Sequence, residues 1–214
     1  MKKIFILLLL LLLNACEKGP AIDDQTYPWQ IKITPAGNTQ VFGIELSKTP
    51  LGHAARGISN RYELGLFEDK QGQLSLEAYF NEVTRGGLSG KLIMLLQADQ
   101  QQLHSFRSRS VKGKPQESGV LKYTLSFDDK KLSEQLVVKS LSYIPYVNLD
   151  KEMISKRFGV PDKVIKSNDG LTHYFYLKNG LDVIHSEDGK EVLQYVLPGN
   201  IKQLLLPMKI EQSQ

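Results

Sequence analysis

Hydrophobic and polar residues alternate along much of the chain after residue 28, with the period of strands that bury one face. In the first half, such segments cover residues 29–33, 41–46, 61–67, 74–80 and 88–96. In the second half, they cover residues 119–127, 137–144, 171–177, 181–185 and 191–196. Most are separated by turn residues rich in Gly, Asp and Asn, so we expect antiparallel strands joined by short loops.

Four other segments have the period and the end signals of helices. In the first, Thr49 is placed to be the N-cap and Pro50 the first helical residue. In the last, Asp150 caps the start, and Gly159 followed by Pro161 ends the helix in the usual order. The expected helices cover residues 49–58, 99–108, 128–136 and 150–158.

The two halves repeat one order of elements: a strand, a short capped helix, then three antiparallel strands. We therefore expect an α+β fold made of two helix-plus-antiparallel-sheet modules in tandem. The first module would cover residues 29–110 and the second residues 119–206, with residues 111–118 as the boundary loop. The apolar tail, residues 201–208, should pack on the last sheet or engage a partner.

The N-terminus has the layout of an export signal. Lys2 and Lys3 precede an apolar stretch of ten residues, 4–13, which leads to Ala15 and Cys16. A basic start, a short apolar stretch and small residues at the cut are typical of a secretory signal peptide. The stretch is too short for a membrane-spanning helix, which needs about 20 residues.

The run Leu13-Asn14-Ala15-Cys16 resembles the bacterial lipobox. The resemblance implies that the Cys16 sulfur receives a diacylglyceryl group, that the signal peptide (residues 1–15) is removed and that the new amine is acylated. Several acyl chains anchor a protein far more firmly than one. Glu17 replaces the Asp that would resemble an inner-membrane retention signal, so we expect the periplasmic face of the outer membrane, with residues 16–28 as a flexible tether. The alternative is an ordinary secretory signal with a chance cysteine.

Charge and cysteine content exclude some classes of function. The chain carries 27 Lys and Arg against 23 Asp and Glu, and two of the lysines precede Cys16, so the part from Cys16 onward has a formal charge of +2. A nearly neutral surface gives no argument for nucleic-acid binding. Cys16 is the single cysteine, so no disulfide can form within the monomer.

No sequence motif indicates catalysis, a metal or a cofactor. Residues 86–91 lack the first Gly and the final Ser or Thr of a phosphate-binding loop and predict a hairpin turn. His173 and His185 could face each other across neighbouring strands, as a surface or edge pair or, alternatively, as a metal or proton-sensing site. The acidic pairs Glu68-Asp69 and Glu187-Asp188 fall in turns, where Asp is favoured by its own hydrogen bonds.

The second half contains Arg157-Phe158-Gly159-Val160-Pro161 and, further on, Tyr174-Phe175-Tyr176. A short helix that ends in this way, followed by an aromatic hairpin, resembles the module of the β-lactamase-inhibitor-protein-like superfamily. That superfamily includes the small lipoprotein of the outer-membrane β-barrel assembly machine. The resemblance covers residues 144–196, with a looser echo in residues 41–96, and the whole chain resembles proteobacterial lipoproteins of a two-module layout.

Tyrosines gather in the second half, where they could form core or a binding face. The candidate partner-binding residues are Tyr143, Tyr146, Tyr174, Tyr176 and Tyr195. We predict a non-enzymatic lipoprotein that contacts the membrane through its lipid and binds an envelope protein through sheet edges or this tyrosine-rich face. The alternative is a carrier of a small apolar ligand.

Overall fold

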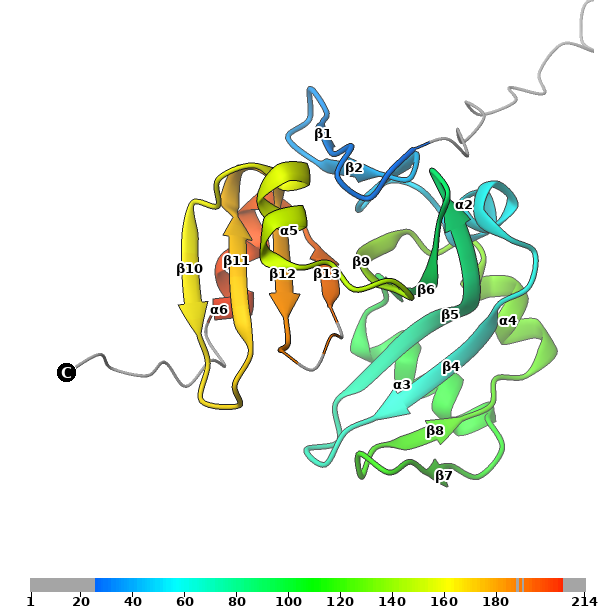
Figure 1. Cartoon of the computed structure of the whole chain (residues 1–214). Coiled ribbons are helices and arrows are strands. Elements are labelled where there is room, and N and C mark those ends of the chain that lie inside the picture. The colour runs from blue at the N-terminus through cyan, green and yellow to red at the C-terminus, as the bar shows by residue number, and fades with distance from the viewer. Residues whose placement is uncertain (1–25, 188, 190, 206–214) are drawn as a thin grey trace, which may run out of the picture.

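The computed structural model describes residues 26–187, 189 and 191–205 of the 214-residue chain (Figure 1). One antiparallel sheet of ten strands dominates it, in the order β10-β11-β12-β13-β9-β6-β5-β4-β8-β7. The strands are β4 (Glu63–Glu68), β5 (Leu74–Arg85), β6 (Leu88–Leu96), β7 (Lys114–Pro115), β8 (Leu121–Tyr123), β9 (Val138–Pro145), β10 (Lys163–Lys166), β11 (Thr172–Tyr176), β12 (Leu181–His185) and β13 (Val192–Tyr195). The prediction of helices combined with an antiparallel sheet is confirmed.

Strand β9 joins the two halves of the chain within this sheet. It pairs with β6 on one side and with β13 on the other, so that Tyr143 lies opposite both Leu92 and Leu193. Residues 111–118, expected to form a boundary loop, contain β7, which pairs with β8 beside β4. Strands from both expected modules therefore belong to a single sheet.

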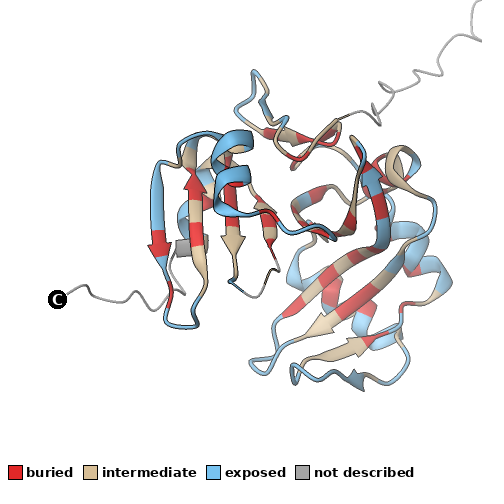
Figure 2. Cartoon of the chain, viewed as in Figure 1, coloured by how far each residue is buried: buried red, intermediate tan, exposed pale blue. Residues whose placement is uncertain are grey.

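One face of the sheet carries the main hydrophobic core. Along β5 and β6, buried and half-buried residues alternate, and the buried set faces the core (Figure 2). One continuous cluster of buried residues runs from Leu76 and Phe80 in the first half to Leu193 and Tyr195 in the second. A small second cluster covers part of the opposite face.

The described residues form five α-helices around the sheet, together with the 3₁₀ turns η2 (Leu177–Asn179) and η3 (Pro198–Asn200). They are α2 (Leu51–Ile58), α3 (Gln100–Arg109), α4 (Phe127–Ser133), α5 (Lys151–Phe158) and α6 (Ile201–Leu205). In Figure 1, α5 lies in front of one half of the sheet while α3 and α4 lie behind the other. Buried residues of α3 and α5 nevertheless belong to the same core, because the strands twist strongly across the sheet.

Of the two predicted N-caps, one is confirmed and one is wrong. Asp150 accepts a hydrogen bond from the backbone N–H of Met153 at 2.7 Å and caps α5. Pro50, and not Thr49, is the N-cap of α2. The Thr49 hydroxyl instead accepts a hydrogen bond from the Glu45 N–H at 3.0 Å, which ties the helix start to the preceding strand.

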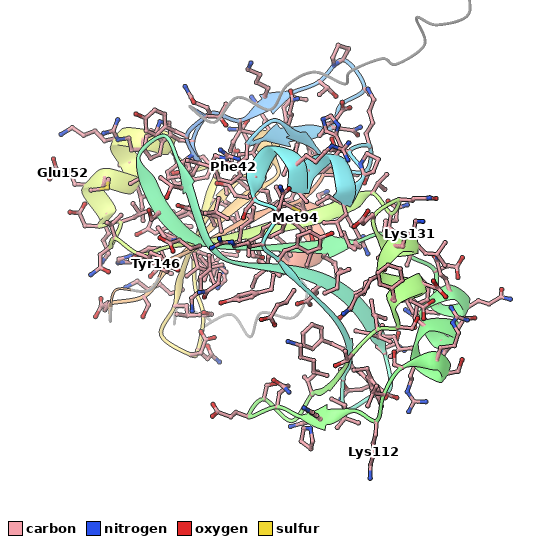
Figure 3. All side chains as sticks on the ribbon, turned by 90° about the vertical axis from the view of Figure 1, so that its right-hand side faces the viewer. Phe42, Met94, Lys112, Lys131, Tyr146 and Glu152 are labelled. Atoms are coloured by element: carbon pink, nitrogen blue, oxygen red, sulfur yellow. The ribbon has the colours of Figure 1, made fainter. Side chains whose placement is uncertain are left out.

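The prediction of one strand over residues 41–46 is wrong. The segment folds back between β2 (Thr39–Val41) and β3 (Ile44–Glu45), which with β1 (Lys32–Ile33) form a separate three-stranded sheet. Phe42 (φ 53°) and Gly43 (φ 75°) form the turn, and positive φ at both central residues is typical of a tight hairpin. Phe42 is buried, with its ring 5.4 Å from that of Tyr143, so core packing compensates its unusual backbone (Figure 3).

Other segments differ in extent from the predictions. Strand β5 continues to Arg85 instead of ending at residue 80, and α4 covers Phe127–Ser133 instead of residues 128–136. Residues 29–33 contain only the two-residue strand β1, and residues 119–127 contain the three-residue strand β8 followed by the start of α4. Strand β10 was not predicted. The hairpin turn between β5 and β6 was predicted, and Gly86 and Gly87 form it with positive φ angles.

Candidate functional site

Cys16, the predicted lipidation site, lies outside the described residues, and lipidation stays a prediction. The chain is described from Thr26, and it is fixed to the core soon afterwards. The Tyr195 hydroxyl donates a hydrogen bond to the Pro28 carbonyl at 2.9 Å, and the rings of Tyr27 and Trp29 stack at 4.7 Å. Thr26 follows Cys16 by ten positions, so at most about 36 Å separates the predicted lipidation site from the described domain.

Three of the five candidate tyrosines lie in the core. Tyr143 and Tyr195 have no exposed surface, and Tyr176 is 4% exposed. Burial raises the pKa of Tyr143 and Tyr176 to about 12 and that of Tyr195 well above its usual value. Their hydroxyls therefore stay protonated and donate to backbone carbonyls, Tyr143 to Leu88 at 3.2 Å and Tyr176 to Gly159 at 3.1 Å.

The other two tyrosines reach the surface. Tyr146 is 51% exposed, although its hydroxyl donates to the Asn81 carbonyl. Tyr174 is half-buried and lies between Val164 of β10 and Val183 of β12. A partner can reach only these two side chains in this structure, and a partner-binding role for the five tyrosines stays a prediction.

The two histidines do not face each other, so that expectation is wrong. His173 pairs with Ile184, whereas His185 pairs with Thr172, which places the two imidazoles on opposite faces of the sheet. Neither lies on an edge strand. Each histidine instead contacts the carboxylate of a different acidic residue.

The His173 Nδ1 lies 2.8 Å from Asp182 Oδ2, and both residues are buried. Burial raises the pKa of Asp182, and His173 opposes that rise. The His185 Nδ1 lies 3.0 Å from Glu191 Oε1, whose second oxygen accepts the Leu149 N–H at 2.9 Å. Within the described residues, no group of three His, Cys, Asp or Glu could hold a metal ion.

The acidic residues expected in turns contribute to local structure. Asp69 accepts hydrogen bonds from the N–H groups of Gln71 and Gln73 and shapes the turn after β4.

Glu68 accepts from the Tyr123 hydroxyl and from Arg107, and these two bonds lower its pKa although burial opposes the change. Glu187 is exposed in a turn, and Asp188 lies outside the described residues.

The segment after α5, residues 159–162, forms a firmly held turn that we call the anchored turn. Gly159 ends the helix with φ 80°, and its carbonyl accepts the Tyr176 hydroxyl. At the other end, Asp162 Oδ2 accepts the Leu177 N–H at 2.7 Å. Phe158 packs beside it, 5.9 Å from the Tyr176 ring. Although both ends are fixed, Val160 between them is 89% exposed.

The anchored turn leads directly into β10, the outermost strand at one edge of the sheet. No other described strand pairs with its outer side, and β10 is exposed along most of its length (Figure 2). Val164 is 51% exposed and lies on the same face as its neighbour Tyr174. We call Val160, Val164, Tyr174 and the outer side of β10 the edge surface.

Lysines give the edge surface a positive charge. Lys163 and Lys166 are exposed, and no described carboxylate lies within ion-pair distance of either. The opposite edge of the sheet differs. There, β7 has two residues, and one of them, Pro115, has no N–H to donate. The edge surface is therefore the better site for pairing with another chain.

The edge surface is not apparent from the sequence, for an identifiable reason. Strand β10 has the sequence Lys-Val-Ile-Lys, which is too short and too polar at its ends to stand out as a strand. Val160 did occur in the helix-end motif, but the motif gave no indication that its side chain would be exposed.

The described start of the tail packs on the last sheet, which is one of the two possibilities expected for it. Ile201 is 3% exposed and lies with Ile165 and Phe175 in the second core cluster, and Leu204 packs against them. Residues 206–208 lie outside the described part of the chain.

A groove of about 690 Å³ lies between α2, α4 and strands β4 and β8, and its lining is rich in charged side chains. It does not have the closed aliphatic lining that carriage of an apolar ligand would favour. None of the helices within the described ranges is long and apolar enough to cross a membrane.

The fold thus defines an α+β protein whose ten-stranded antiparallel sheet presents an exposed edge surface. No protein-family model, no curated protein and no solved structure matches the chain. The function is therefore argued from the sequence and from the geometry of the described residues.

Proposed function

We propose that this protein is a non-enzymatic lipoprotein that binds an envelope protein through its edge surface. Cys16 would carry the lipid, and the domain would lie on the periplasmic side of the outer membrane. The lipobox-like run supports the anchor, and the edge surface supports the binding role.

The observation that carries the binding role is the exposure of Val160 on the anchored turn. An edge strand presents N–H and C=O groups that an extended segment of another protein can pair with. Val160 and Val164 add apolar contact area next to those groups. Because the turn is held at both ends, little conformational entropy is lost when a partner covers Val160.

The charge of the edge surface indicates the kind of segment that would pair with it. Lys163 and Lys166 favour a partner strand with acidic side chains and disfavour a second copy of β10 itself. Lysines on an edge strand also reduce non-specific pairing of that strand with other chains. That protective role alone does not account for two exposed valines beside them.

We also propose that the chain consists of two tandem helix-plus-sheet modules, residues 29–110 and 119–206, fused through β9. The support is the shared order of elements: α2 precedes the meander β4-β5-β6, and α5 precedes the meander β10-β11-β12-β13. Among the described strands, the free edges of the fused sheet are β10 and β7, and β7 and β8 extend the meander of the first module although they follow residue 110 in the chain.

Isolation of the protein from chemically crosslinked envelopes tests the binding role. Wild type should recover a defined partner, and the double variant Val160→Ser with Val164→Ser should lose most of it. The control Val111→Ser changes a valine that is 67% exposed and precedes β7, the strand at the opposite edge of the sheet. It should recover the partner at the wild-type level. Equal recovery by all three proteins would refute the edge surface as the docking site.

The alternative, carriage of a small apolar ligand, has less support. Three cavities of the described residues, the groove among them, each include charged side chains in their linings. A lipid-sized mass bound to the purified protein in native mass spectrometry would support ligand carriage.

A further inference from the structure

The groove between α2 and α4 is independent of the edge surface and contains none of its residues. Its volume of about 690 Å³ lies within the range of sites for small molecules, roughly 300–1,000 Å³. Residues of α2 and α4 line it, together with Leu64 of β4 and Thr124. The two helices approach closely at Gly52, where a Cβ atom would lie 3.3 Å from the Glu134 carbonyl.

The cations that line the groove are not balanced by anions. Its four cations are Arg56, Lys122, Lys130 and Lys131, and its two carboxylates are Glu63 and Glu134. The carboxylates already have partners. Glu63 accepts from Lys122 at 3.3 Å, and Glu134 accepts from the Tyr62 hydroxyl at 3.3 Å.

Four cations against two carboxylates leave the lining with a net charge of +2, because the Tyr62 hydroxyl does not neutralise Glu134. Three of the cations have no described carboxylate within ion-pair distance. Arg56 comes from α2, while Lys130 and Lys131 come from α4 (Lys131 is labelled in Figure 3). A guanidinium and two ammonium groups from two helices can bind one phosphate or carboxylate together.

The groove also offers an apolar surface beside these cations. Phe127, the first residue of α4, is 81% exposed, although burial of a large apolar side chain would lower its free energy. The Ser126 hydroxyl accepts the Asp129 N–H at 3.1 Å and fixes the helix start. The Tyr62 ring lies 5.2 Å from that of Phe80 in the core, so a second aromatic wall is held in place.

We propose that this groove binds a small amphiphilic anion, with a phosphate or carboxylate group on an aromatic or similarly flat apolar body. Arg56, Lys130 and Lys131 would hold the anionic group. Phe127 and Tyr62 would contact the body. The size of the groove and its mixed lining favour such a molecule over an extended polypeptide.

Amide NMR titration of the purified full chain with phenyl phosphate tests the proposal. The expected shifts concentrate in α2, α4 and the residues between them in the groove. The variant Lys130→Gln with Lys131→Gln should raise the dissociation constant by about fivefold or more. The matched control Lys139→Gln with Lys202→Gln removes the same charge from β9 and α6 and should bind as wild type does.

Two further probes test the anionic group and the apolar body of the proposed ligand separately. Inorganic phosphate and benzyl alcohol should each bind more weakly than phenyl phosphate. Phe127→Ser should weaken phenyl phosphate but leave inorganic phosphate unchanged, and its helix start should remain intact because the side chain is exposed. Shifts outside the groove, equal binding of benzyl alcohol, or equal loss in the two lysine pairs would each overturn the proposal.

Discussion

Cys16 is the residue on which the predicted location of the protein depends. If its sulfur and amine carry acyl chains, Cys16→Ser should move the protein out of the outer-membrane fraction of a density gradient. Wild type should incorporate labelled palmitate and the variant should not. A variant that remains with the outer membrane would show that another part of the chain holds it there.

Gly159 sets the direction in which the chain leaves α5 for the edge surface. Its φ of 80° is a backbone conformation that side chains with a Cβ rarely adopt. We expect Gly159→Ala to lower the free energy of unfolding by about 1–2 kcal/mol in denaturant titrations. Gly199→Ala is the control, because a Cβ meets nothing within 4 Å at either position and only Gly159 has a positive φ. Equal effects of the two substitutions would contradict the assigned turn geometry.

At the scale of elements, α3 and α4 are joined by a partly buried ion pair. Arg109 Nη2 lies 2.6 Å from Oδ1 of Asp129, whose side chain is 1% exposed. Burial opposes ionisation of Asp129, but hydrogen bonds from Arg109 and Ser126 outweigh it and lower the pKa of the carboxyl below its usual 3.8. The folded state therefore favours the charged carboxylate more than the unfolded chain does.

The sign of the pH dependence follows from that lowered pKa. The pair stabilises the fold above pH 3.8, and the contribution is lost as pH falls through the folded-state pKa. Arg109→Gln should therefore lower the unfolding midpoint at pH 7, and the difference from wild type should shrink in acid. Lys156→Gln breaks the exposed pair with Glu152 and serves as the control, with little effect expected at either pH. A difference that stays constant down to pH 3 would contradict this role of Asp129.

Elements with local signals were the ones that the sequence predicted well. Strands β6 and β12 have their predicted bounds, because glycine turns limit them and their apolar residues alternate or run together. Helix α5 was predictable from the cap at Asp150 and the stop at Gly159. The Phe42-Gly43 turn was not, because a phenylalanine with positive φ is stabilised by core contacts with Tyr143 and Tyr195, which are distant in sequence.

The candidate site was less predictable than the fold. The exposure of Val160 depends on hydrogen bonds from Tyr176 and Leu177, and the pairing of His173 with Asp182 depends on strand register. Neither is encoded in a local pattern. Tyrosine content predicted an aromatic cluster in the second half, but strand alternation directs Tyr143 and its neighbours inward.

At the scale of the whole molecule, Tyr143 links the two halves of the sheet. It lies on β9 between Leu92 and Leu193, and it packs against Phe42. Because one core spans both halves, Tyr143→Ala should lower the free energy of unfolding by about 3–5 kcal/mol. Tyr143→Phe loses only the bond to the Leu88 carbonyl and should cost about 1 kcal/mol.

Hydrogen exchange measured by mass spectrometry shows whether the halves respond together. In Tyr143→Ala, peptides from β5 and β6 and peptides from β12 and β13 should lose protection to a similar degree. Loss confined to one half would mean that the two modules are stabilised independently despite their shared sheet.

Site-specific photocrosslinking in intact envelopes tests the proposed function most directly. A photoreactive residue at position 160 or 164 should form an adduct with one and the same partner protein, and the adducts should map to an extended segment of that partner. The same probe at position 111, another exposed valine, should not. Absence of an adduct at positions 160 and 164, or the same adduct at all three positions, would contradict a partner-binding edge at β10.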